Sequence, residues 1–384
     1  MKKRMIIAAA IATLVAAPAQ ADIKIGLTGA LTGPLAGTYA PAVEGLKLYL
    51  DGVNKAGGIK GENIELILLD DGMEPSRAAA NAKRLLSQER VVLMVNSSLS
   101  STYAPTINEA KRAGVPLLFA ASACPAEVFP PADKNMFCTT GFGPSYDSQA
   151  ALGFVSRTDG TNVKMGFHAM TIPISRGEID YAESLAGKMG MTPVAKEISP
   201  PPTPDYSPFA ANIANAGADW VWSWAPWVGQ VKTFEALRRQ GWGGSFITYS
   251  HLEAEGELAR LKDGDFYVIG ANAMSYEDMP VLKDMTAAAQ AAGSQYGAGE
   301  MMEGWIAGMA IEAALNGASN ANDPDALRTA MSSVNVDTKG LRGGNLQWTA
   351  DNHFRTQQSY RVYRWNTSSG KIEVAQDWVT FDVK

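Results

Sequence analysis

The residues that could carry out acid–base or nucleophilic chemistry form no recognisable nucleophile–base pair in this sequence. The three histidines, His168, His251 and His353, lack the short spacing of metal-binding pairs. The sequence has no G-x-S-x-G, P-loop or C-x-x-C motif, and the segment GFGPSY at 141–146 lacks the third glycine of a dinucleotide loop. We therefore expect no metal, no cofactor and no catalytic site.

Residues suited to holding an apolar molecule are concentrated in DWVWSWAPW, residues 219–227. Trp220, Trp222 and Trp224 alternate, which places them on one face of a strand. We interpret Trp220 and Trp222 as core residues. Trp224 and Trp227 stand where the strand ends, and we expect both to contact a ligand.

The two cysteines, Cys124 and Cys138, are close enough in sequence to close a short loop. In an exported protein such a pair is typical of a disulfide, which would stabilise the fold by about 3 kcal/mol through loop entropy. Two buried free thiols are the alternative.

The first 21 residues indicate export. Basic residues at 2–4 precede an apolar run from 5 to 17, and Ala19-Gln20-Ala21 forms a small-x-small cleavage site. The run is too short for a comfortable membrane anchor. We predict cleavage after Ala21, which leaves 30 basic residues against 39 acidic ones. This acidic balance, without a basic cluster, disfavours nucleic acid as a partner.

Along the rest of the sequence, predicted strands alternate with predicted helices. About 360 mature residues exceed one ordinary core and predict two domains. Near-continuous apolar strands between helices predict α/β architecture with two doubly wound parallel-sheet lobes. Strands are expected at 23–29, 63–71, 91–98 and 115–122, and then at 162–170, 192–199, 219–225 and 245–250.

The run after residue 272 is mostly helical and is expected to return to the first lobe, followed by antiparallel strands in the tail. Ligands of open parallel sheets bind beyond the carboxyl ends of the strands. Two lobes with facing sheet ends would form a cleft that closes on a ligand.

The opening IKIGLTGALTGPLAGTY, with NKAGGIKG, and the segments PLLFAASACPAE and MFCTTGFGPSYDSQA carry a family resemblance over nearly the whole mature chain. The sequence resembles the periplasmic solute-binding proteins of ABC transporters, in the leucine/isoleucine/valine-binding group with a type I periplasmic-binding fold. The resemblance implies a periplasmic monomer that serves a membrane permease and its ATPase. It also implies three lobe crossings, near 141–144, 271–275 and 343–347. Lobe 1 would comprise 22–142 plus 272–344, and lobe 2 would comprise 143–271 plus 345–384.

The resemblance also implies ligand-binding positions. The serine loop NSSLSS would hold a carboxylate through Ser98 or Ser100. The segment after the fourth strand would hold an ammonium, but here it contains Ala121 and Ala123, without the expected hydroxyl. Relatives also place an acidic residue after the 245–250 strand to pair with the ammonium. Here that position is His251, and Glu253 follows two residues later. Both departures disfavour an α-amino acid, because an unpaired buried ammonium costs several kcal/mol.

Further candidates come from the rim of the cleft. Arg176 stands at the lobe 2 rim, where its guanidinium could bind a carboxylate in a fork; the alternative is an exposed arginine pairing with Glu178 or Asp180. Tyr39 follows the first-strand loop, and Tyr103 follows the serine loop. Met301 begins a helix at the rim, where core packing is the alternative.

We therefore hypothesise an exported receptor that delivers a small apolar or aromatic carboxylic acid to an ABC permease. The nearest alternative keeps this role with a branched-chain or aromatic amino acid, or an amide, as ligand. A second alternative is a sensing subunit for a membrane signalling partner.

Overall fold

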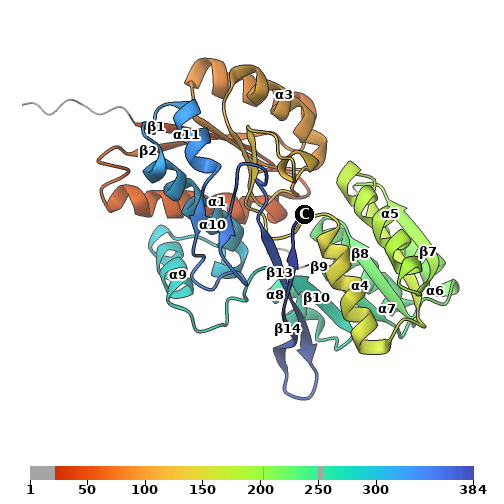
Figure 1. The fold of residues 1–384 in the computed structure, drawn as a ribbon. Coiled ribbons are helices and arrows are strands. Elements are labelled where there is room, and N and C mark those ends of the chain that lie inside the picture. Colours follow the sequence, from red (N-terminus) through yellow and green to blue (C-terminus); the bar gives the residue numbers. More distant parts are fainter. Residues whose placement is uncertain (1–21, 202, 250–253) are drawn as a thin grey trace, which may run out of the picture.

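The computed structural model describes residues 22–201, 203–249 and 254–384. The chain folds into two α/β lobes joined by three crossing segments, and the long hairpin of β13 (Gln357–Asn366) and β14 (Lys371–Asp382) extends along the second lobe (Figure 1). This confirms the predicted fold class. The expected cleavage site and His251 lie outside the described residues.

Lobe 1 is built on a five-stranded parallel sheet of order β2-β1-β3-β4-β5. Helices α1, α9 and α10 enclose one core with it, and α2 and α3 enclose another. Its strands are β1 (Ile23–Gly29), β2 (Ile64–Asp70), β3 (Leu93–Ser97), β4 (Leu117–Phe119) and β5 (Met136–Cys138), and its helices are α1 (Ala36–Lys55), α2 (Pro75–Arg84), α3 (Tyr103–Ala113), α9 (Pro280–Ala292), α10 (Ala298–Gly317) and α11 (Pro324–Met331).

Lobe 2 is built on a seven-stranded sheet of order β14-β13-β10-β9-β8-β6-β7, in which only the pairings of β13 are antiparallel. Helices α4 and α5 cover one face, and α6 and α7 cover the other. The elements are α4 (Tyr146–Asp159), β6 (Lys164–Met170), α5 (Pro173–Lys188), β7 (Thr192–Ser199), α6 (Ser207–Asn215), β8 (Trp220–Trp224), α7 (Trp227–Arg239), β9 (Ser245–Tyr249), α8 (Ala254–Leu261), β10 (Phe266–Gly270), β13 (Gln357–Asn366) and β14 (Lys371–Asp382).

The third crossing lies later than the boundary expected at residue 345. The short antiparallel pair β11 (Asn335–Val336) and β12 (Leu346–Gln347) stays beside lobe 1. Trp348 belongs to the lobe 1 core, and Phe354 packs with the residues around β4 and β5. The chain joins the lobe 2 sheet only at β13, because these two aromatic side chains are buried in lobe 1.

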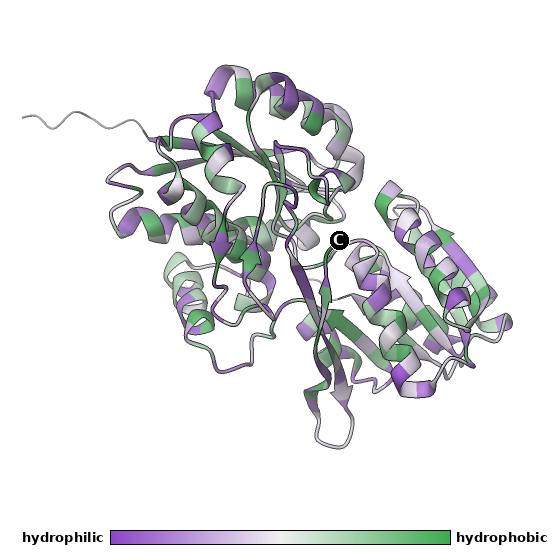
Figure 2. Cartoon of the chain, in the orientation of Figure 1, coloured by the Kyte–Doolittle hydropathy of each residue, from purple (hydrophilic) through white to green (hydrophobic). Residues whose placement is uncertain are grey.

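Apolar residues concentrate in the central strands and on the inner faces of the helices, whereas polar residues lie mainly on the outer faces (Figure 2). In lobe 1, α10 lies directly against α1. A Cβ atom at Gly304 would fall 1.6 Å from the carbonyl oxygen of Ala42, and one at Gly45 would fall 2.2 Å from that of Met301. Glycine is thus required where the two helices cross. Among the described residues, no helix is both long and apolar enough to span a bilayer.

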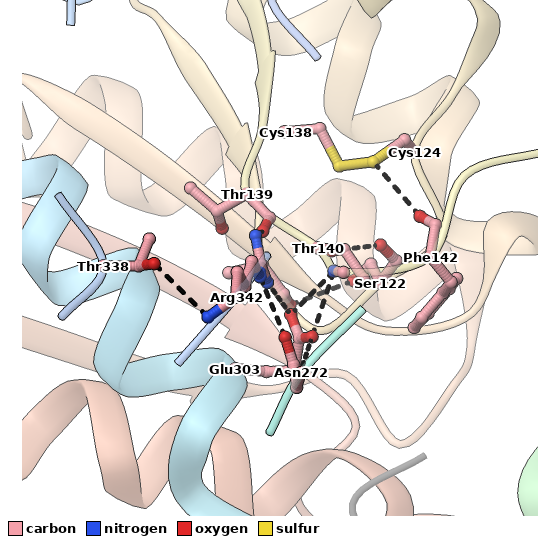
Figure 3. A network of polar contacts seen from close by, with 12 residues as sticks. Ser122, Cys124, Cys138, Thr139, Thr140, Phe142, Asn272, Glu303, Thr338 and Arg342 are labelled. Carbon is pink, nitrogen blue, oxygen red and sulfur yellow. Dashed lines mark hydrogen bonds and ion pairs between the residues drawn. A yellow bond between two sulfur atoms is a disulfide. The ribbon is translucent and has the colours of Figure 1, made fainter. Parts of the chain in front are cut away.

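Glu303 of α10 connects two of the crossings with the segment that leads to the third (Figure 3). Its carboxylate accepts hydrogen bonds from the amide of Gly141 at 3.0 and 3.1 Å and from Asn272 at 2.6 Å, and it forms an ion pair with Arg342 at 3.0 Å. Gly141 and Asn272 belong to the first and second crossings, and Arg342 lies between β11 and β12, in the lobe 1 segment that leads to the third crossing. Arg342 also donates to Asn272 at 2.8 Å and to the carbonyl oxygen of Thr139. The carboxylate therefore fixes where the crossings meet.

The disulfide joins Cys124, after β4, to Cys138, at the end of β5, with 5.7 Å between their Cα atoms. Both cysteines are buried, so of the two alternatives the structure has the bridge. It lies beside the first crossing, where Thr140 donates to the carbonyl oxygen of Ser122 at 2.6 Å (Figure 3). The bridge thus connects the segment after β4 to the start of the first crossing.

We predict that Glu303→Ala lowers the free energy of unfolding by about 3–5 kcal/mol, because it leaves the buried Arg342 charge without its carboxylate. Both side chains are only 5% exposed. Urea denaturation followed by circular dichroism measures the change. The matched control is Asp337→Ala, which removes an ion pair to Lys339 that is 62% exposed on each side. The control should lose less than about 1 kcal/mol, and an equally small loss for Glu303→Ala would contradict the assigned role.

Candidate functional site

A small cavity lies where the carboxyl ends of the lobe 1 and lobe 2 strands face each other. We call it the inner cavity. Its volume is about 20 Å³, room for about one water molecule, so a larger ligand enters only if the lobes separate. Its lining consists of Thr38, Tyr39, Leu99, Ser100, Tyr103, Ala121, Ala123, Phe142, Ile172, Ile174, Trp224, Pro226 and Tyr249.

The two lobes contact each other across this cavity through apolar side chains. Leu35, Tyr39 and Leu99 of lobe 1 belong to one buried cluster with Met170 and Ile172 of lobe 2. The structure thus shows the cleft in a closed arrangement, with the predicted binding region enclosed.

Six of the residues predicted from the sequence meet at the inner cavity. They come from the start of α1, the loop after β3, the start of α3, the segment after β4 and the end of β8. They are Tyr39, Ser100, Tyr103, Ala121, Ala123 and Trp224. The carboxyl-end rule for parallel sheets explains why residues so distant in sequence converge.

Of the two serines, Ser100 and not Ser98 faces the cavity. Ser98 is fully buried, and its hydroxyl donates to Asp71 at 2.8 Å. Ser100 lines the cavity, and its hydroxyl oxygen is buried without a hydrogen-bond partner among the described residues. An unsatisfied buried hydroxyl costs about 1–3 kcal/mol, so this position favours a ligand that supplies a partner.

The segment after β4 has its polar groups engaged within the protein. The Tyr103 hydroxyl donates to the carbonyl oxygen of Ala123 at 2.6 Å, and Thr140 donates to that of Ser122. Burial raises the pKa of Tyr103 well above its usual value, so the phenol stays a neutral donor. Ala121 adopts a left-handed backbone with φ of 55°. Two of the three carbonyl oxygens at 121–123 therefore already accept a hydrogen bond from the protein, which leaves fewer acceptors for a ligand ammonium.

Aromatic rings form the lobe 2 side of the cavity. Phe142, Trp224 and Tyr249 pack with ring centroids 4.9 to 6.0 Å apart. Phe142, Tyr249, Ile172 and Ile174 were not singled out from the sequence. Only their positions in the sequence could have indicated that they line the cavity, because Tyr249 ends a strand and Ile172 and Ile174 come shortly after the end of another.

The three strand tryptophans of β8 are anchored to α4. Trp220 donates to Asp159 at 2.7 Å, Trp222 to Ser148 at 3.1 Å and Trp224 to Asp147 at 2.7 Å. Trp220 and Trp222 are core residues, as the alternation predicted. Trp224 continues the same face to the inner cavity, so Asp147 fixes the orientation of a cavity wall.

Asp147 and Glu178 form a buried carboxyl pair behind Trp224. Burial raises the pKa of Asp147 to about 6, although Tyr360, Gly143 and Trp224 donate to it. Burial, and then the charge of Asp147, raises the pKa of Glu178 to about 8. Because the pKa of Glu178 is the higher of the two, we assign the proton that the pair keeps at neutral pH to Glu178.

Three other predicted residues among those described are absent from the lining of the inner cavity. Trp227 begins α7 and is buried against Phe266, with ring centroids 6.4 Å apart. Met301 lies in the lobe 1 core, because α10 packs closely on α1. Arg176 is exposed in the first turn of α5 and is absent from the cavity lining. His251 lies outside the described residues.

The two alternative partners of Arg176 are engaged elsewhere. Asp180 pairs with Lys196 at 3.0 Å, and Glu178 accepts from Ser145 and Ser148 in α4. The structure therefore places Arg176 on the surface without either expected contact.

The two histidines that the structure describes are held by hydrogen bonds within the fold. His168 is fully buried between Ser223 at 2.9 Å and Ser199 at 3.1 Å, and burial lowers its pKa to about 3. His353 contacts backbone carbonyl groups of Asp133 and Met136. Within the described ranges, no group of three or more His, Cys, Asp or Glu residues is arranged to hold a metal.

A second, larger cavity of about 640 Å³ adjoins the first, and we call it the outer cavity. It lies between the 34–35 and 72–74 turns of lobe 1 and the 170–172, 203–206 and 228–232 segments of lobe 2. Leu99 and Ile172 line both cavities.

Comparison with known proteins identifies the family. The family model described as "Periplasmic binding protein" matches residues 22–371. An amino acid binding protein of Pseudomonas aeruginosa is 26% identical over 357 residues, which cover 91% of each chain.

Two solved structures share the fold. The substrate binding protein LivJ of Streptococcus pneumoniae, a branched-chain amino acid transporter component in complex with isoleucine, has a TM-score of 0.78 at 20% identity and covers 94% of this chain and 100% of its own. A solute binding protein of R. palustris in complex with benzoate has a TM-score of 0.78 at 17% identity, covering 94% and 99%.

We predict that Glu178→Gln flattens the pH dependence of stability between pH 6 and pH 8. In this range the folded state keeps a proton on Glu178 that the unfolded state, with a pKa near 4.5, has released. Stability of the unmodified protein therefore falls as pH rises, by up to about 1.4 kcal/mol per pH unit. Urea midpoints at pH 6, 7 and 8 measure the slope. Glu65→Gln, at an exposed carboxylate, should keep the original slope; an unchanged slope in Glu178→Gln would refute the assignment.

Proposed function

The chain belongs to the periplasmic binding protein family, and on that premise we propose that it binds a small apolar or aromatic carboxylic acid in the inter-lobe cleft and delivers it to an ABC permease. The observation that carries the ligand class is the lining of the inner cavity: an unpartnered hydroxyl at Ser100 beside aromatic rings, without a carboxylate among its described residues.

Most hydroxyl-bearing side chains of the lining come from lobe 1, and most of its large apolar side chains come from lobe 2. Lobe 1 contributes the hydroxyl groups of Thr38, Tyr39, Ser100 and Tyr103. Beyond the first crossing, lobe 2 contributes aliphatic and aromatic side chains at Ile172, Ile174, Trp224, Pro226 and Tyr249. In the proposed complex the carboxylate faces lobe 1, where Ser100 donates to it, and lobe 2 covers the apolar body.

An amino acid is the alternative ligand, and the isoleucine and amino acid named for two relatives support it. Its ammonium would need an acceptor. The described lining supplies no carboxylate, and the Ala123 carbonyl oxygen already accepts from Tyr103. The benzoate named for the R. palustris protein supports the acid. Glu253, the nearest acid to the position expected from the sequence, lies outside the described residues. It is the candidate partner for the ammonium of an amino acid ligand.

We predict that benzoate or 3-phenylpropanoate raises the melting temperature in a thermal-shift panel, whereas leucine, isoleucine and benzamide do not. A ligand that binds only the folded state stabilises it by about 2.7 kcal/mol at 100 times its Kd. Stabilisation by leucine or isoleucine, without any by the acids, would overturn the proposed ligand class in favour of the alternative.

We also predict that Ser100→Ala weakens binding of the acid about tenfold or more, because a hydrogen bond to a charged group contributes about 1.5–3 kcal/mol. Isothermal titration calorimetry measures the change. Ser368→Ala, in the exposed turn between β13 and β14, is the control and should leave Kd unchanged. Arg176→Ala tests the other carboxylate anchor: a loss there larger than at Ser100 would move the carboxylate to the lobe 2 rim.

A further inference from the structure

The outer cavity remains open although the lobes are in contact. Its volume of about 640 Å³ lies within the ~300–1,000 Å³ range of pockets that enclose drug-sized ligands. The inner cavity, by contrast, is almost completely filled by side chains. Closure of the lobes thus seals the serine end of the cleft and leaves a chamber beside it.

The floor of the outer cavity is buried and mainly apolar. Leu35 and Leu99 of lobe 1 and Met170, Ile172 and Tyr206 of lobe 2 are each at most 7% exposed, and they belong to one cluster. Apolar surface of this kind favours an apolar occupant. The outer cavity is therefore chemically suited to a hydrocarbon or aromatic body.

Two side chains separate the cavities, and each comes from a different lobe. Leu99 and Ile172 line both spaces, with Ser100 directly after Leu99 on the inner side. A ligand held by its carboxylate at Ser100 would thus pass between Leu99 and Ile172 into the outer cavity. The partition opens when the lobes separate, since its two halves move with different lobes.

The rim of the outer cavity carries two charged side chains. Glu74 of lobe 1 and Lys232 of lobe 2 are exposed there, and Lys232 pairs with Glu235 at 3.0 Å. The apolar part of the cavity is therefore bounded on one side by the Leu99–Ile172 partition and on the other by charges at the solvent edge. This arrangement suits a chain that begins at the serine loop and ends near the rim.

We propose that the outer cavity receives the extended apolar body of the ligand, so that the preferred substrates are long aryl-alkyl or alkyl carboxylates. The inference rests on the proposed function, because it requires the carboxylate at Ser100. It adds a chain-length preference and a second compartment that determines it.

The test is a series of ω-phenyl acids of increasing length, from benzoate through 3-phenylpropanoate and 5-phenylpentanoate to 8-phenyloctanoate, titrated by calorimetry into the mature protein. Each methylene that enters the outer cavity should tighten binding about fourfold until the cavity is filled. A Kd that stays constant or rises beyond benzoate would overturn the second compartment and leave the proposed function intact. Binding of amino acids with no acid of any length bound would overturn both.

Val228→Trp tests the compartment directly. Val228 lines the outer cavity and is 38% exposed, so a larger side chain fits there without entering the core. The substitution should weaken 8-phenyloctanoate at least tenfold and change benzoate less than twofold, and retained benzoate binding verifies the fold. The matched control is Val374→Trp, at a valine of β14 that is 43% exposed, and it should change neither Kd. Equal effects of Val228→Trp on short and long acids would contradict the compartment.

Discussion

The buried carboxylate of Glu303 is the contact on which the two-lobe arrangement depends. A carboxylate at this depth must be paired and hydrogen-bonded. Its partners here are Gly141 and Asn272 of the first two crossings and Arg342 of the segment that leads to the third. The connections between the lobes therefore meet at one polar centre inside lobe 1. Helix α10, which carries Glu303, packs closely on α1 through the glycines where the two helices cross.

A second buried polar group performs the corresponding task in lobe 2. Asp147 accepts hydrogen bonds from Gly143, at the first crossing, from Trp224, at the cavity, and from Tyr360 of β13. Through these contacts the orientation of a cavity wall is coupled to two of the crossings. The Glu178 proton allows both carboxyl groups to lie in this low-dielectric region, because two adjacent buried charges would repel each other strongly.

Much of the fold and about half of the inner-cavity lining could be predicted from the sequence. The alternation of Trp220, Trp222 and Trp224 correctly indicates one face of a strand, and the carboxyl end of that strand lies at the cleft. The expectation for Trp227 failed to anticipate that α7 begins at this residue, directly after Pro226, and that the first helical turn carries the ring to the other side of the sheet. The position of Met301 depends on the close crossing of α1 and α10, and the third crossing depends on burial of Trp348 and Phe354. These are tertiary contacts, which no local pattern encodes.

The disulfide has a consequence for the order in which a ligand meets the two halves of the cleft. The bridge at Cys124 and Cys138 encloses the segment that follows Ala121 and Ala123, and it ends just before the first crossing. This wall belongs to lobe 1, as the serine loop does, and the bridge ties it covalently to the start of the first crossing. If the lobes separate as we propose, we expect the lobe 1 wall to keep its shape and to meet the ligand first. The aromatic side chains of lobe 2 would then close over the ligand and bury its apolar surface, which would favour the closed arrangement.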